Sequence, residues 1–338
     1  MIVFFPTYAR RVPGGWSAAV AGMVVRPLPE RSRRRVLAVA VLRRLLELED
    51  EQLASEVFRR RAESFLFQRV AGRRVTITLG GRRFAAGQSD RSGHFRAELD
   101  LDEEFVAGLA PPGRDRRLAY AAVLDDGDED ALPEPPAGAV HLVDADGMSV
   151  ISDIDDTVKV SNVANRRELL RNTLLREFAA VPGMPDAYRR WHEAGATFHY
   201  VSASPWQLSE SLCTFLTAAG LPAGSMHLKL FRLKDSTPLG RLPSRKRSKR
   251  RTIEQIMGDF PQRRFLLVGD SGERDPEVYA SVARRRPAQV AGILIRQVES
   301  RASRSKVRTR LERLARRLPE GMLRVFTAAD ELDATPAS

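Results

Sequence analysis

From about Gly138 to residue 296, strand-like apolar runs alternate with amphipathic helical patterns. The strand-like runs are "SVISD", "TFHYVSAS", "MHLKLF", "RFLLVGD" and "VAGILIR", and the helical patterns between them lie near 182–195, 206–219, 249–259 and 275–285. Two strands that are joined through a helix run parallel. The alternation therefore predicts an α/β domain of Rossmann type, with a parallel sheet and helices on both faces.

The first 137 residues have a different pattern. Short alternating runs separated by turn residues predict a β-rich domain, and three- and four-residue apolar spacing predicts a helical segment at about 32–65. The acidic stretch Asp125–Asp130 and the proline-rich residues after it predict a linker, because the spacing of the acids does not fit a calcium loop. We therefore expect a β-rich domain at 1–137, a second domain at 138–300, and a basic C-terminal helix and tail at 301–338.

Composition narrows the setting of the protein. The chain has 338 residues, of which 43% are hydrophobic, which fits a globular protein with a core. We find no apolar run of the roughly 18 residues that a membrane span needs, and no signal peptide pattern at the start. Cys213 is the single cysteine, so an internal disulfide is excluded and we interpret it as a small core residue. A cytoplasmic location follows, with peripheral membrane contact as an alternative.

The chain is strongly basic. Its formal net charge of +12 favours anionic partners, which include nucleic acid, phosphorylated substrates and acidic lipid surfaces. A dense basic run, Arg241–Arg251, could contact an anionic membrane. Specific nucleic-acid binding is not expected, because no helix-turn-helix, zinc-finger or RNP-type signature accompanies the charge.

Polar clusters follow three of the predicted strands. They are Asp153–Thr157, Ser202–Ser204 and Gly269–Asp275. In a sheet of this kind, functional groups collect at the carboxyl ends of the strands. A shared Mg²⁺ between Asp153 and Asp270 would explain why so many carboxylates are tolerated there.

The same residues suit phosphoryl chemistry. Asp153 could attack phosphorus to form an aspartyl-phosphate, and Asp155 could protonate the leaving oxygen and later activate water. Ser202 and backbone amides could bind phosphate oxygens, while a lysine neutralises the transferring group. Lys249 is the best candidate for that lysine, and Lys229, Lys234 and Lys246 remain alternatives.

The motifs also resemble a known superfamily. DxDxT at 153–157, a serine after a strand, a lysine that begins a helix and GDxxxxD at 269–275 resemble the four motifs of the haloacid dehalogenase superfamily. The strings "ISDIDDTVKVSNV", "YVSASPWQL" and "LLVGDSGERDPEVYA" are similar to the actin-patch-associated phosphatidate phosphatase family, which is related to the lipins. The resemblance covers about residues 140–300.

The resemblance implies a haloacid dehalogenase-type parallel sheet and Mg²⁺-dependent hydrolysis of phosphatidate to diacylglycerol. It implies Asp153 as the nucleophile and Asp155 as the acid/base, whose backbone carbonyl also touches the metal. Asp270 would complete the metal ligands. It also implies that Ser202, Lys249 and Thr157 bind the phosphate. Asp275 and Ser271 would support the site.

Other readings of the sequence remain open. The substrate could be a soluble phosphomonoester such as a nucleotide or sugar phosphate. The domain could also be an anionic-lipid-binding module that has lost catalysis, although Asp153, Asp155 and Asp270 are all present. A second DxD string, "DADGM" at 144–148, lacks the threonine of the first and is interpreted as a hairpin turn.

Overall fold

A computed structural model describes most of the chain. The described residues are 1–29, 31–33, 35, 36, 39, 40, 43, 49–113, 115–124, 138–163, 165–229, 245–298, 304–333 and 335. They form two compact units: Met1–Asp144 with Gly224–Met226, and Ala145–Ala223 with His227–Ser338. The predicted linker at 125–137 lies outside the described residues, as do residues 241–244 of the basic run.

The first unit is built on a nine-stranded sheet. Its main path runs β1-β3-β2-β9-β8-β5-β6, while β4 and β7 both pair with β3. The strands are β1 (Ile2–Phe4), β2 (Thr7–Val12), β3 (Gly15–Pro27), β4 (Phe67–Arg69), β5 (Arg74–Leu79), β6 (Arg82–Gln88), β7 (His94–Asp102), β8 (Arg117–Leu124) and β9 (Gly138–Val143). Strict alternation in β5 buries Val75, Ile77 and Leu79 in the core of this unit.

Short helices accompany this sheet. They include α2 (Asp50–Ala54), α3 (Glu56–Glu63) and α4 (Glu103–Leu109). Within the predicted helical segment at 32–65, Ser55 has an extended backbone, ends α2 and caps α3 by accepting a hydrogen bond from the Phe58 amide. The segment is therefore interrupted rather than continuous, because a serine that can cap a helix favours a new helix start over an uninterrupted one.

The second unit contains the predicted parallel sheet. Its strand order is β12-β11-β10-β13-β14-β15, and the pairs from β11 to β15 are parallel. The strands are β10 (Met148–Ser152), β11 (Thr197–Pro205), β12 (Gly224–Lys229), β13 (Arg264–Asp270), β14 (Val290–Arg296) and β15 (Leu323–Phe326). The α/β fold class expected from the sequence is confirmed.

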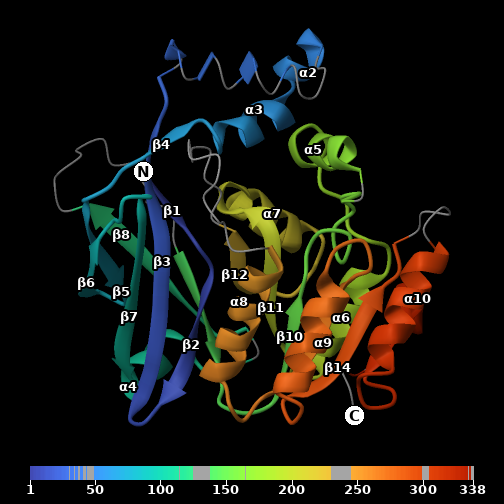
Figure 1. Ribbon diagram of the computed structural model, residues 1–338. Helices are drawn as coiled ribbons and strands as arrows, with labels where there is room; N and C mark the ends of the chain where they lie inside the picture. The colour runs from blue at the N-terminus through green and yellow to red at the C-terminus, as the bar shows by residue number, and fades with distance from the viewer. Residues whose placement is uncertain are drawn as a thin grey trace. The chain divides into compact units, whose positions relative to one another are not determined.

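Helices cover both faces of this sheet. Figure 1 shows α8 (Arg245–Asp259), α9 (Asp275–Arg285) and α10 (Arg304–Ala315) on one face, and α6 (Met184–Glu193) and α7 (Ser209–Ala218) on the other. Helix α5 (Arg166–Leu174) lies between the first acidic motif and α6. None of the helices in the described part of the chain is long and apolar enough to cross a membrane.

The direction of winding places a switch point at the centre of the sheet. The chain winds outward from β10 through β11 to β12, and then from β13 through β14 to β15 in the opposite direction. Strands β10 and β13 are adjacent, and the Asp153 amide donates to the Val268 carbonyl at 2.9 Å just beyond their paired residues. Ligands of doubly wound sheets bind at the carboxyl ends of such strands.

A buried arginine fixes the opposite end of these strands. The Arg263 guanidinium donates to the Ser149 hydroxyl at 2.8 Å and to the Thr197 hydroxyl at 3.0 Å, and it also donates to the Asp146 carbonyl. Asp146 belongs to the "DADGM" turn, which joins β9 of one sheet to β10 of the other. The turn is therefore not a hairpin, since the strands on either side of it do not pair.

Candidate functional site

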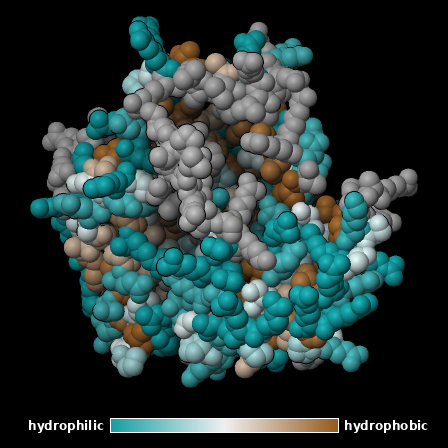
Figure 2. Space-filling model, in the orientation of Figure 1, coloured by the Kyte–Doolittle hydropathy of each residue, from teal (hydrophilic) through white to brown (hydrophobic). Residues whose placement is uncertain are grey.

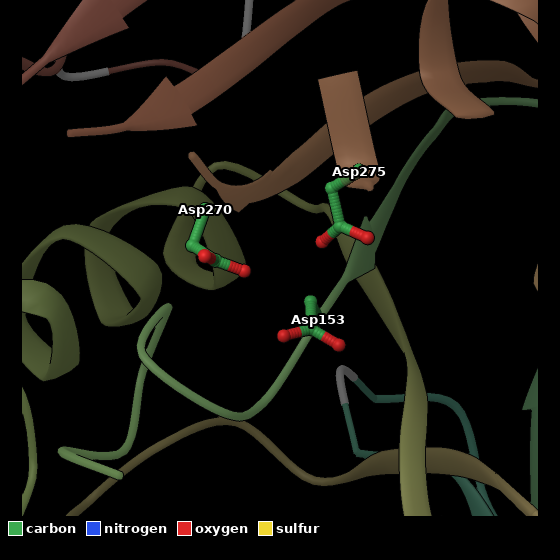
Figure 3. A group of neighbouring side chains, drawn as sticks. All are labelled: Asp153, Asp270 and Asp275. Carbon is green, nitrogen blue, oxygen red and sulfur yellow. The ribbon is translucent and has the colours of Figure 1, made fainter. Parts of the chain in front are cut away.

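Three buried aspartates meet at the switch point. Asp153 follows β10, Asp270 ends β13, and Asp275 begins α9. One oxygen from each of them lies within 4.8 Å of the others, and Figure 3 shows the three carboxylates directed into one shared space. The structure therefore brings Asp153 and Asp270 together, as the shared-cation hypothesis requires.

Lys249 contacts two members of this group. Its Nζ atom lies 2.7 Å from Asp153 Oδ1 and 2.6 Å from Asp275 Oδ1, and its side chain is only 9% exposed. Among its sequence rivals, Lys229 lines the neighbouring cavity, whereas Lys234 and the side chain of Lys246 lie outside the described residues. Lys249 is thus the described lysine whose ammonium reaches the acidic group.

The electrostatics of the group reflect its burial. Desolvation raises the pKa of Asp153 well above its usual range, although the Lys249 ammonium opposes that rise. Desolvation and the Asp275 charge raise the pKa of Asp270 to about 8. Desolvation would lower the pKa of Lys249, but the Asp153 and Asp275 carboxylates raise it well above normal. One ammonium therefore does not compensate three buried carboxyl groups.

The group fits a hard divalent cation. Within the described part of the chain, Asp153 Oδ2 and Asp270 Oδ2 are buried and have no hydrogen-bond partner. Buried polar atoms nearly always have a hydrogen-bond partner, so two buried carboxylate oxygens without one indicate that a cation binds there. Mg²⁺ prefers such oxygens and binds through one or two carboxylates. Asp153 and Asp270 are therefore the residues that would hold it.

The Asp155 side chain lies apart from this group. Its Oδ1 atom is 2.7 Å from Lys159 Nζ and accepts a hydrogen bond from the Ser161 hydroxyl at 2.6 Å. Its Oδ2 atom accepts a hydrogen bond from the Ser204 hydroxyl at 2.7 Å. Burial alone would raise the pKa of Asp155, but the Lys159 charge and these hydrogen bonds lower it to about 2. Asp155 is therefore held as a carboxylate.

Sequence reasoning missed Lys159. Its side chain is 2% exposed, and its ammonium pairs with Asp155, donates to Ser161, and lies 4.7 Å from the centre of the Phe178 ring. A lysine is almost never fully buried unless it is paired. The signal that could have identified it is its place two residues after Thr157, within the quoted motif, where a cation can reach a motif carboxylate.

Asp156 shapes the turn that carries these groups. It adopts a positive φ of 54°, and its carboxylate accepts hydrogen bonds from the amides of Ser161, Asn162 and Val163 at 2.7–2.8 Å. The turn therefore folds back on itself directly after β10. Thr157 is buried within it, and its hydroxyl has no hydrogen-bond partner in the described part of the chain.

Ser202 lies within β11, three residues before the strand ends at Pro205, and contacts Asp155. Its hydroxyl donates to Asp155 Oδ2 at 3.1 Å and accepts from the Ser204 amide at 3.0 Å. Ser202 also lines a cavity of about 230 Å³ together with Lys249 and Asp275. The apolar residues that line this cavity are Val163, Val201, Leu228 and Val278. Its lining also includes the cationic residues Lys229 and Arg274.

Ser271 supports the loop after β13. Its amide donates to the Arg296 carbonyl at 2.9 Å, and its hydroxyl accepts from the Val298 amide at 3.0 Å. In the same loop, Asp270 Oδ1 accepts hydrogen bonds from the amides of Gly272 at 2.6 Å and Glu273 at 3.0 Å. Asp270 therefore keeps one oxygen bound to its own loop and directs the other into the site.

Cys213 lies on α7 and takes no part in this site. Its side chain is half-buried, and desolvation raises the pKa of the thiol to about 11. A thiol that is protonated at neutral pH is a poor nucleophile. The position therefore supports a packing role.

Comparisons with known proteins identify relatives of part of the chain. Residues 148–297 match the family model described as "Phosphatidate phosphatase APP1, catalytic domain". An uncharacterised protein of Schizosaccharomyces pombe is 36% identical over 184 residues, which are 53% of this chain and 30% of that protein. Phosphatidate phosphatase APP1 of Saccharomyces cerevisiae is 36% identical over 154 residues, which are 44% of this chain and 26% of that protein. The chain thus spans less than a third of the length of these relatives.

A solved structure was also compared. It is a Mesorhizobium loti protein described provisionally as a HAD-like phosphatase, with 14% identity and a TM-score of 0.31 over 49% of this chain and 86% of that one. All three sequence strings that resemble the phosphatase family lie within the matched residues 148–297. Residues 1–144 of the first unit lie outside that match.

Proposed function

We propose that the protein hydrolyses phosphatidate to diacylglycerol and phosphate in a Mg²⁺-dependent reaction, because residues 148–297 match the model of the APP1 phosphatidate phosphatase catalytic domain. The observation that carries this proposal is the meeting of Asp153, Asp270 and Asp275 with Lys249 beside a cavity. Phosphatidate is the substrate named by the family, and the apolar wall of the cavity suits a substrate with a lipid portion.

In the first half of the reaction, an Asp153 oxygen attacks phosphorus and forms an aspartyl-phosphate. Lys249 and Ser202, which both line the cavity, bind the phosphate oxygens. The bond between phosphorus and the lipid oxygen breaks, and Asp155 gives that oxygen a proton so that diacylglycerol leaves. Asp155 is ionised in the free protein, so it takes up this proton as the negative charge of the phosphate approaches and raises its pKa.

In the second half, Asp155 is a carboxylate again and acts as a base. It removes a proton from water, the water oxygen bonds to phosphorus, and the bond from phosphorus to Asp153 breaks. Phosphate leaves and the Asp153 carboxylate is restored. Mg²⁺, when held by Asp153 and Asp270, would neutralise negative charge on the phosphoryl group.

Peripheral contact with an anionic membrane completes the proposal. In the part of the basic run that begins α8, Arg247 and Arg251 are exposed, and Lys249 on the same turn of helix reaches the acidic group. Basic side chains near an anionic lipid surface each contribute about 1 kcal/mol to binding. Such a contact would bring the cavity close to a substrate that resides in the membrane.

Phosphate release tests the proposal. The wild-type protein should release phosphate from phosphatidate in mixed micelles when Mg²⁺ is present, and should not do so with excess EDTA. Asp153→Asn should lower that rate by more than about 10³-fold, because it removes the attacking group. Asp146→Asn is the matched control, since Asp146 belongs to the second DxD string and is exposed.

The same assay separates the alternatives. Faster turnover of nucleotide or sugar phosphates than of phosphatidate would indicate a soluble phosphomonoester as the substrate. Binding to phosphatidate vesicles without phosphate release would indicate a non-catalytic lipid-binding module. Full activity of Asp153→Asn would exclude the aspartyl-phosphate mechanism.

A further inference from the structure

Helix α10 belongs to the second unit, although it lies beyond the segment that matches the family model. The match ends at residue 297, whereas α10 spans Arg304–Ala315. Leu311 on this helix is buried, and β15, which follows it, extends the sheet by pairing with β14. The exposed surface over α9 and α10 is mainly hydrophilic (Figure 2).

One side chain of α10 reaches the acidic loop. The Arg310 guanidinium donates to the Ser271 carbonyl at 2.7 Å and to the Glu273 carbonyl at 3.3 Å. Its Nε atom lies 3.8 Å from a Glu277 oxygen on α9. Arg310 is 28% exposed at its side chain, so these contacts are largely shielded from water.

The contact to Ser271 fixes a peptide plane. The carbonyl of Ser271 and the amide of Gly272 belong to one peptide group, and no peptide bond among the described residues is cis. In a trans peptide, the C=O and the N–H point in opposite directions. While Arg310 binds the carbonyl on one side, the Gly272 amide points the other way and donates to Asp270 Oδ1 at 2.6 Å.

The second contact of Arg310 holds the next part of the loop. The Glu273 amide also donates to Asp270 Oδ1, at 3.0 Å, and the Glu273 carbonyl faces Arg310. Two amides therefore hold Oδ1, whereas Oδ2 is buried and has no hydrogen-bond partner among the described residues. One oxygen of this carboxylate lies within the acidic group. The orientation of this carboxylate depends on a loop whose carbonyls Arg310 binds.

We propose that Arg310 is a positioning residue, which holds the loop after β13 so that Asp270 presents one oxygen for a divalent cation. This inference rests on the proposed function, because it concerns the same cation. Arg310 does not line the described cavity. It therefore acts through Asp270 and not on the substrate.

The test uses the full chain and measures Mg²⁺ in two ways. Calorimetry without substrate gives the affinity for Mg²⁺, and phosphate release gives the Mg²⁺ concentration for half-maximal rate. Loss of a group that orients a metal ligand typically weakens metal affinity by 10- to 100-fold. Arg310→Ala should therefore raise both values by about that factor, while the KM for the substrate at saturating Mg²⁺ stays within about twofold.

Two further variants complete the design. Arg310→Lys keeps a donor but not the forked geometry, so its Mg²⁺ affinity should lie between those of the wild type and Arg310→Ala. Arg308→Ala is the matched control, because Arg308 lies on the same helix with an 80% exposed side chain and pairs only with Glu312 among the described residues. It should leave Mg²⁺ affinity unchanged.

The outcomes are distinguishable. Unchanged Mg²⁺ affinity in both Arg310 variants would overturn the inference while leaving the proposed function intact. If Arg310→Ala does not fold, Arg310→Lys decides by the same measurement. A wild-type protein that binds no Mg²⁺ would overturn the inference together with the metal dependence of the proposed function.

Discussion

The pair of Asp155 and Lys159 shows what burial requires of single residues. Both side chains are removed from solvent, and their charged atoms are 2.7 Å apart. Breaking a buried ion pair on one side costs far more than the pair contributes, because the remaining charge is left uncompensated. Lys159 is therefore needed wherever Asp155 stays ionised.

Lys159→Met tests this dependence. The substitution keeps much of the side-chain volume but removes the charge, so we expect the second unit to lose about 3–5 kcal/mol of stability in urea unfolding. Lys306→Met is the control, because Lys306 is exposed on α10 and its replacement should change stability by no more than about 0.5 kcal/mol. Adding Asp155→Asn to Lys159→Met should recover part of the loss. Equal stability of the two single variants would contradict the prediction.

At the scale of residues, the sequence predicted where the site residues lie better than it predicted which side chains contact one another. The motif spacing placed Asp153 and Asp270 on adjacent strand ends. Lys249 reaches both Asp153 and Asp275, although it does not begin its helix as the sequence predicted, because α8 starts at Arg245. The sequence did not predict the Asp155–Lys159 pair, because that contact depends on how the turn after β10 folds back. The turn depends in turn on Asp156, which binds three amides and adopts a left-handed conformation.

At the scale of elements, sequence periodicity predicted the buried strands and missed a short strand at the sheet edge. The runs that became β10, β11 and β13 are buried on both faces and read as continuous apolar strings. Strand β15 lies at the sheet edge, and only Phe326 in it is buried, so its four residues show no strand pattern. The expected C-terminal helix and tail therefore contains an additional strand.

The contact between β13 and α9 requires a glycine. A Cβ atom at Gly269 would lie 2.8 Å from the Tyr279 ring and 2.9 Å from the Asp275 Cβ, which is too close for either neighbour to remain in place. We expect Gly269→Ala to displace Asp275 from Lys249 and to lower stability by about 1–3 kcal/mol. Urea unfolding measures the stability, and Mg²⁺-dependent phosphate release measures the site.

Gly258→Ala is the matched control for that substitution. Gly258 lies on α8, and the nearest atom to an added Cβ is Arg286 Nη2 at 3.7 Å, which is ordinary contact. Alanine is a better helix former than glycine, so this variant should gain up to about 1 kcal/mol. A Gly269→Ala variant with wild-type stability and wild-type rate would show that Asp275 needs no close approach to β13.

At the scale of the whole molecule, a net charge of +12 does not offset the acidic cluster. Exposed charges more than about 8–10 Å away are largely screened at physiological ionic strength. Only groups inside the site can compensate the carboxylates, and Lys249 is the cation that contacts them within the described residues. The stability of the metal-free protein should therefore depend on pH.

The sign of that dependence follows from Asp270. Desolvation raises its folded-state pKa to about 8 from an ordinary value of 3.8, so between these values the folded state holds a proton that the unfolded state has released. Stability is then lost as pH rises toward 8, by up to about 1.4 kcal/mol per pH unit for one proton. Asp155, with a pKa lowered to about 2, titrates outside this range.

Thermal unfolding of the metal-free protein between pH 7.0 and 8.5 tests this sign. The interval lies above the range in which the histidines with lowered pKa values, His94 and His141, take up protons. We expect a loss of about 1 kcal/mol of stability, or about 2–4 °C in the Tm of the second unit. Mg²⁺ binds the ionised carboxylate, so the stabilisation it provides should grow over the same interval. Asp270→Asn should abolish most of both effects. A Tm of the metal-free wild type that rises with pH would contradict the prediction, because it would show that the Asp270 carboxyl group is not desolvated.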